Sequence, residues 1–281
     1  MTEPAPPLPP SFFDAYTPDQ IALRVENVGM LKADMPALPL FALAFLAGAF
    51  IALGAMFFTL AVTGSGLGFG PTRVLGGIAF SLGLILVVVG GAELFTGNVM
   101  MVMGWADGRV ATRALLRNWG LVYVGNFVGA GAMAAIAHQA GVFALDSGNV
   151  GATARTLAEA KAALPFWTAF WKGVLCNTLV CLAIWLCFAA HSVVDKIFAI
   201  IFPISAFVAL GFEHSIANMY IIPAGAFAGG LEGGLLRGLV ANLAPVTLGN
   251  VVGGGAFVAA AYYVVYLRGR RRDGPAKEPE R

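Results

Sequence analysis

The sequence predicts an all-α membrane protein with six transmembrane helices, and three observations support this. First, 59% of the 281 residues are hydrophobic and only 11% are charged, against roughly 25% charged residues in a typical soluble domain. Second, several apolar stretches are long enough to cross ~30 Å of hydrocarbon as helices. Third, two halves of the chain share polar motifs in the same order. A soluble, nucleic-acid-binding or disordered protein is therefore excluded.

The apolar stretches define the predicted spans, which are helical because a backbone in lipid must satisfy its own hydrogen bonds. They lie at residues 38–62, 73–104, 115–138, 164–190, 197–225 and 243–267. A long polar segment precedes the first span, which excludes a cleaved signal peptide. All three cysteines fall in the fourth span, so a disulfide-stapled secreted domain is excluded as well.

Basic residues predict the orientation of the chain. Of the Lys and Arg residues, 12 flank the spans on the side of the two termini and 4 lie on the opposite side. The positive-inside rule then places both termini in the cytoplasm. We divide the chain into a cytoplasmic start at 1–36, a channel domain at 37–268 and a basic tail at 269–281. An amphipathic helix at 17–31 either lies on the membrane surface or packs against the bundle.

Two motifs occur twice. Gly-x-Glu-x-x-x-x-Asn occupies residues 91–98 and 211–218, and Gly-Asn-x-Val-Gly occupies 125–129 and 249–253, at offsets of 120 and 124. The chain therefore consists of two related repeats, at residues 37–140 and 160–268. Because each repeat holds three spans, the second enters the bilayer upside down, which predicts an inverted 3+3 repeat.

The first motif places a Glu, a hydroxyl and an Asn inside an apolar segment. An unbroken helix facing lipid does not tolerate such a group, so we expect spans two and five to be broken, with the freed backbone lining a cavity. The N-terminus of a broken half-helix favours an anion. Two such ends facing each other predict an anion site near the middle of the membrane.

Ionisable side chains inside the spans are functional candidates, because each is costly there. They are Glu93, Lys172, Glu213 and His214. His214 is the only histidine near the centre of a span, where it could donate a hydrogen bond or a proton to an anion; the alternative is a packing histidine. Lys172 could attract anions in an outer vestibule, or snorkel and pair with one of the two glutamates, and the two roles are compatible. For Glu93 and Glu213 we favour a structural role, in which the carboxylate accepts backbone N–H groups.

Other residues carry weaker signals. Phe95 and Phe207 fit either an apolar constriction of a pore or ordinary packing. The cysteines, at offsets of five and six, do not share a helix face. We therefore predict no metal site and no cofactor.

Four segments, at residues 90–98, 172–177, 211–219 and 245–250, closely resemble the formate/nitrite transporter family. The resemblance covers about residues 17–268. It implies an aquaporin-like protomer in a homopentamer within the lipid bilayer. Each protomer would hold its own pore for a small monovalent anion such as formate, nitrite, hydrosulfide or lactate, and would not be an enzyme.

The resemblance also implies roles for particular residues. His214 would be the central pore histidine that protonates the anion, and Thr96 would lie on the loop that interrupts span two. Asn177 and Asn250 would be polar neighbours of the histidine, and Lys172 the basic residue of the outer vestibule. The hydrophobic constrictions would be formed by Leu84, Phe95, Val180 and Phe207.

The substrate and two other functions stay open at this point. Residues 63–70 and 218–223 look more like formate channels, whereas 170–177 look more like the nitrite branch, and we favour formate. A membrane subunit of a redox enzyme would need paired histidines to hold haem. An aquaporin-type channel for neutral solutes would need paired Asn-Pro-Ala signatures, which the sequence lacks.

Overall fold

The computed structural model describes residues 15–229 and 234–269, which form helices and connecting turns without a strand. The all-helical fold predicted from the sequence is therefore confirmed for this part of the chain. Residues 1–14 of the predicted cytoplasmic start and residues 270–281 of the predicted basic tail lie outside the described residues.

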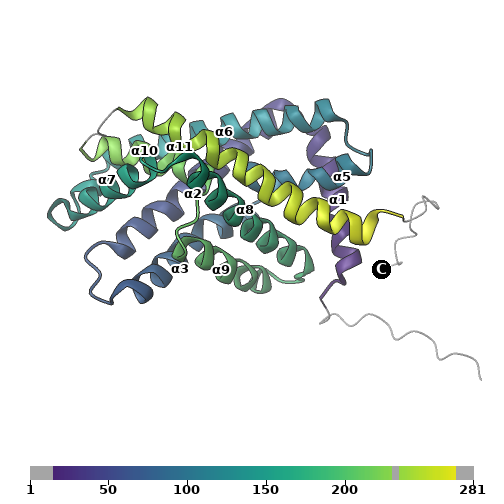
Figure 1. The fold of residues 1–281 in the computed structure, drawn as a ribbon, viewed down its shortest axis with the longest axis horizontal. Coiled ribbons are helices and arrows are strands. Elements are labelled where there is room, and N and C mark those ends of the chain that lie inside the picture. Colours follow the sequence, from purple (N-terminus) through teal and green to yellow (C-terminus); the bar gives the residue numbers. More distant parts are fainter. Residues whose placement is uncertain (1–14, 230–233, 270–281) are drawn as a thin grey trace, which may run out of the picture.

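Five helices within the described residues are long and apolar enough to cross a membrane. They are α2 (Ala37–Val62), α3 (Phe69–Gly90), α6 (Thr112–Gln139), α8 (Phe166–Ala189) and the run Leu235–Leu267, which consists of α11 (Leu235–Val252) and two π-helical stretches (Gly253–Ala260 and Tyr263–Leu267). Most of them run along the long axis of the molecule (Figure 1).

The other helices are shorter. They are α1 (Pro18–Asp34), α4 (Phe95–Asn98), α5 (Val102–Ala106), α7 (Asn149–Ala162), α9 (Val193–Ala209) and α10 (Ser215–Phe227), with 3-10 turns at Val99–Met101, Val142–Ala144 and Asp146–Gly148. The helix expected at 17–31 corresponds to α1. Helix α7, which lies between the predicted third and fourth spans, was not predicted from the sequence.

The predicted second and fifth spans are both interrupted. Helix α3 ends at Gly90 and α4 begins at Phe95, while α9 ends at Ala209 and α10 begins at Ser215. Each interruption contains a glycine with positive φ, +76° at Gly91 and +72° at Gly211. This left-handed conformation costs little only for glycine, so the first glycine of the repeated motif is what turns the chain out of each helix.

Glycines also bring the long helices together in pairs. A Cβ on Gly129 of α6 would collide with the Phe45 carbonyl oxygen of α2, and a Cβ on Gly253 would collide with the Val174 carbonyl oxygen of α8. The backbones therefore touch in both halves, as small residues permit at helix interfaces in membranes. These tight pairs form the frame on which the two interruptions sit.

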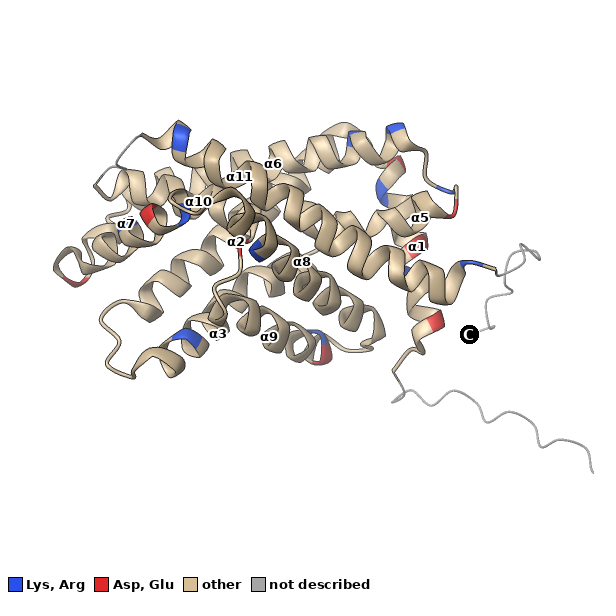
Figure 2. Ribbon diagram, in the orientation of Figure 1, with Lys and Arg blue, Asp and Glu red and all other residues tan. Residues whose placement is uncertain are grey.

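Charged residues lie mostly near the ends of the helices, and the long middle stretches of the helices carry few of them (Figure 2). Large apolar side chains are exposed along the flanks, including Phe57, Leu60, Phe202 and Phe257. An apolar flank between charged ends is the pattern expected for a protein surrounded by lipid.

Candidate functional site

Two buried asparagines hold the interruptions in place. Asn126 Oδ1 accepts the Phe95 N–H (2.9 Å), and its Nδ2 donates to the carbonyls of Ala44 (2.7 Å) and Glu93 (2.9 Å). Asn250 does the same in the other half, accepting the Ser215 N–H (2.9 Å) and donating to the carbonyls of Gly173 and Glu213. Each amide therefore satisfies backbone groups that the broken helix leaves without partners.

A lysine, a carboxylate and an amide form a network at each interruption. In the first half, Lys32 Nζ lies 3.0 Å from Glu93 Oε1 and donates to Asn98 Oδ1 at 2.8 Å, and Asn98 Nδ2 donates to Glu93 Oε2 at 2.7 Å.

In the second half, Lys161 Nζ lies 2.9 Å from Glu213 Oε1, and Asn218 Nδ2 donates to Glu213 Oε2 at 2.7 Å. Asn118 and Asn242 extend the two networks by accepting from Asn98 and Asn218. A buried carboxylate is tolerated when it is paired and hydrogen-bonded in this way.

The two interruptions meet at His214 and Thr96. Helix α10 begins directly after His214, whose Nδ1 accepts the Ala217 N–H at 3.1 Å. A ring nitrogen that accepts an amide N–H carries no proton, so the neutral imidazole holds its proton on Nε2. Nε2 lies 3.0 Å from Thr96 Oγ1 and therefore donates to it. The Phe207 ring stacks over the imidazole with centroids 5.9 Å apart.

Two cavities lie on opposite sides of this pair. The α1 cavity, of about 300 Å³, is lined by α1 and the first interruption and includes Lys32, Glu93, Leu94 and Lys196. The α7 cavity, of about 220 Å³, is lined by α7 and the second interruption and includes Lys161, Lys172, Glu213 and His214. His214 is thus reached from the α7 cavity.

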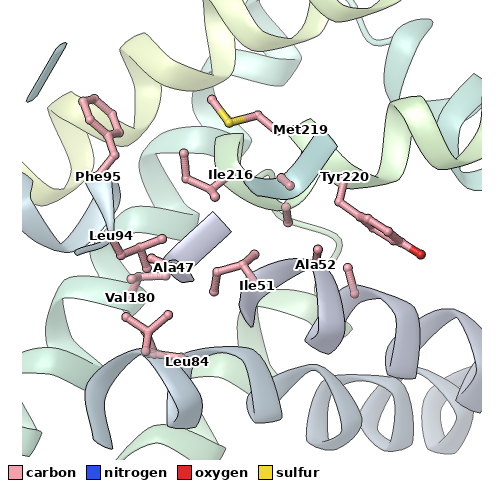
Figure 3. Close-up of a cluster of buried hydrophobic side chains, with 14 of the residues drawn as sticks. Ala47, Ile51, Ala52, Leu84, Leu94, Phe95, Val180, Ile216, Met219 and Tyr220 are labelled. Atoms are coloured by element: carbon pink, nitrogen blue, oxygen red, sulfur yellow. The ribbon is translucent and has the colours of Figure 1, made fainter. Parts of the chain in front are cut away.

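Apolar side chains separate the cavities. Leu84, Leu94 and Val180 are each at most 2% exposed and lie close together, whereas the Phe95 ring points away from them (Figure 3). The Phe95 ring contacts Trp119 and Tyr123 of α6, with centroids 6.0 and 5.0 Å away, and it lines neither cavity. Leu94 lines the α1 cavity, and the ring contacts of Phe95 agree with the ordinary packing that was its alternative role.

Several predicted site residues lie around the central pair. Asn177 Nδ2 donates to the carbonyls of Thr96 (3.2 Å) and Asn250 (2.7 Å), which links the two interruptions. Lys172 lines the α7 cavity, and the ion pairs of the described residues do not include it. The role in which Lys172 pairs with a glutamate is therefore wrong, because each of those carboxylates has another lysine.

Sequence reasoning missed Lys32 and Lys161. Both lie in polar segments outside the predicted spans, where a lysine is usually solvated, so the sequence uses them only as charges that set the orientation. Their separation of 129 residues, close to the offsets of the two motifs, was the available signal.

Potential metal ligands do not cluster in the described part of the chain. It contains no group of three or more His, Cys, Asp or Glu side chains that could hold an ion. The three cysteines are buried and unpaired.

The fold and the site together define a membrane transport protein, in which broken helices line a path through a bundle of apolar helices. Comparison with known proteins gives the particular family. The model of the family described as "Formate/nitrite transporter" matches residues 19–264. The chain belongs to this family, which consists of transporters rather than enzymes.

Individual relatives agree with this assignment. The chain is 39% identical to the formate channel FocA of Escherichia coli K12 over 274 residues, which is 91% of this chain and 96% of FocA. It is 41% identical to a probable formate transporter of Methanothermobacter thermautotrophicus, covering 90% of this chain and 97% of the relative.

Two solved structures are also similar. One, described as a pentameric formate channel with formate bound, has a TM-score of 0.76 at 40% identity and covers 82% of this chain and 98% of its own. The other, an FNT family ion channel, has a TM-score of 0.78 at 30% identity, with coverages of 88% and 98%.

Proposed function

We propose that this chain carries a small monovalent anion, formate in preference to nitrite or hydrosulfide, across the bacterial inner membrane. The observation that supports this best is the central donor pair, His214 and Thr96, buried between two cavities that each present a lysine. Lysines attract anions into the cavities, and the short apolar barrier between the cavities opposes the passage of a hydrated charge.

His214 is the donor that meets the anion in this proposal. An anion in the α7 cavity replaces the Thr96 hydroxyl as acceptor of the Nε2 proton. The anion gains a proton only from an imidazolium, in which Nδ1 has released the Ala217 N–H and taken up a second proton. The neutral acid then faces a lower desolvation cost at Leu84, Leu94 and Val180. The neutral ring that remains keeps its proton on Nδ1 and takes up the next proton at Nε2 from the α7 cavity, which His214 lines.

The proposed architecture is six spans in an inverted 3+3 repeat. The matching hydrogen bonds of Asn126 and Asn250 and the matching Lys-Glu-Asn networks support it, since equivalent contacts recur at similar offsets in both halves. The excess of basic residues beside the termini supports a cytoplasmic α1 cavity and an external α7 cavity. We further propose a homopentamer, as the similar formate channel with formate bound is pentameric.

The experiment is a flux measurement with the purified protein in liposomes. Formate, nitrite and hydrosulfide uptake are compared at two pH values, with empty liposomes as control. We expect formate to enter fastest and faster at the lower pH. The proposal fails if none of the three enters above the control, and glycerol-driven swelling in the same vesicles would indicate a neutral-solute channel instead.

A further inference from the structure

The two cavities differ in charge although their Lys-Glu-Asn networks match. The α7 cavity is lined by three basic side chains, Arg73, Lys161 and Lys172, and by one acidic side chain, Glu213. The α1 cavity is lined by two basic side chains and one acidic side chain. Since one lysine in each cavity is paired with the glutamate, the α7 cavity keeps two uncompensated positive charges and the α1 cavity keeps one.

Both extra charges of the α7 cavity are available to a ligand. Arg73 donates from Nε to the Ala209 carbonyl and from Nη2 to the Val208 carbonyl, both at 2.9 Å. These bonds to the end of α9 fix the guanidinium in place, but carbonyls are neutral and leave its charge uncompensated. Neither Arg73 nor Lys172 has an acidic partner among the described residues.

Lys172 is an addition to the symmetric framework. The Lys172 carbonyl accepts the Glu213 N–H at 3.2 Å, and the Leu43 carbonyl accepts the Glu93 N–H at the same distance. The two residues therefore occupy equivalent positions, and a leucine suffices to hold the interruption. The positive charge of Lys172 is therefore not needed to hold the backbone at the interruption.

We propose that Lys172 and Arg73 form a site for a small divalent oxyanion, such as a short dicarboxylate, in the α7 cavity. Two uncompensated positive charges that line one cavity favour a dianion over a monoanion. The dianion does not pass the apolar barrier, because the cost of dehydrating an ion rises steeply with its charge. It therefore binds at the mouth of the path and inhibits transport from one side. This inhibition rests on the proposed function, whereas the binding itself does not.

The test uses oxalate as the dianion and oxamate, of similar shape with a single carboxylate, as its matched control. Uptake of labelled formate is measured in liposomes that hold the protein in one orientation, with either compound added outside or enclosed inside. We expect oxalate to inhibit from one side only, and oxamate to require at least about a tenfold higher concentration. Equal inhibition from both sides, or equal potency of the two compounds, would overturn the proposal.

The variants are Lys172→Leu, which copies the equivalent residue Leu43, and Lys196→Leu, which removes a charge from the α1 cavity. Lys172→Leu should raise the half-inhibiting oxalate concentration about tenfold, and Lys172→Arg should restore it. Lys196→Leu should leave it unchanged. The proposal is wrong if Lys172→Leu does not alter the oxalate dependence, or if Lys196→Leu alters it equally.

A binding measurement separates this inference from the proposed function. Oxalate titrated into the detergent-solubilised protein should raise its unfolding temperature, more strongly than oxamate does, and Lys172→Leu should abolish the difference. If the protein conducts no formate but shows this difference, the proposed function fails and the dianion site stands. If it conducts formate but oxalate and oxamate raise its unfolding temperature equally, the proposed dianion site is wrong.

Discussion

The two halves of the molecule share a framework but differ in the residues at its centre. Asn126 and Asn250 make the same bonds in each half, whereas the residue directly before the short helix is Leu94 in one half and His214 in the other. The single central donor is therefore an asymmetric feature on a symmetric scaffold. The comparison suggests that duplicated residues hold the path open and unique residues determine what happens along it.

The largest expected effect comes from the duplicated asparagines. Asn126→Ala and Asn250→Ala each leave three backbone groups without their partner, and each unpaired buried group costs about 1–3 kcal/mol. We expect each variant to lose on the order of 3 kcal/mol of stability, seen as a lower temperature at which half of the detergent-solubilised protein stays folded. Asn149→Ala, at an exposed position, is the control and should have little effect. A loss of stability in only one of the two variants would contradict the shared framework.

The paired lysines give the next effect. Lys161→Met and Lys32→Met each leave a buried carboxylate charge facing its cavity, which repels an incoming anion. We expect formate uptake below saturation to fall about tenfold in either variant. Lys161→Arg, which keeps the charge, should retain most of the uptake. Unchanged uptake in both methionine variants would show that the cavities do not lie on the path.

A smaller effect is expected for the unpaired lysine of the α7 cavity. Lys172→Ala removes one charge that concentrates the anion without touching the central pair. The half-saturating formate concentration should rise a few-fold, with little change in the rate at saturation. The measurement is the concentration dependence of uptake into liposomes, and an unaltered dependence would count against a role of Lys172 in the vestibule.

The smallest effect concerns the docking of α1. Burial raises the pKa of Glu26, although Arg109, 2.7 Å away, opposes the shift. A carboxyl whose pKa is higher in the docked state binds its proton more tightly there, so docking strengthens as the pH falls through that pKa and weakens as it rises. A spin label at the exposed position 31 should be slightly less mobile at pH 5 than at pH 7, and Glu26→Gln should remove the difference. A label that is more mobile at pH 5 than at pH 7 would contradict the expected strengthening of α1 docking at low pH.

Sequence reasoning located the interruptions well because their signal is strong. A Glu and an Asn inside an apolar stretch are costly unless the helix breaks, and the glycine with positive φ marks the point of the break in both halves. The same reasoning singled out His214, since a central histidine in a span has few structural explanations.

The partners of these residues were harder to predict. The pairing of Glu93 with Lys32 and of Glu213 with Lys161 joins positions 61 and 52 residues apart, which only the folded chain brings together. Leu94 lines the α1 cavity and Phe95 does not, which the sequence does not predict, because a shift of one residue at the start of a short helix decides which side chain points toward the cavity. Such a direction depends on the angle at which the chain leaves the interruption.

The most direct test of the account is the pH dependence of formate uptake with and without His214. Wild-type protein in liposomes should take up formate faster as the external pH falls. His214→Ala should lose this dependence while it remains folded and assembled, and His138→Ala, which lies outside both cavities, should retain it. An undiminished pH dependence in His214→Ala would contradict the central role of the imidazole.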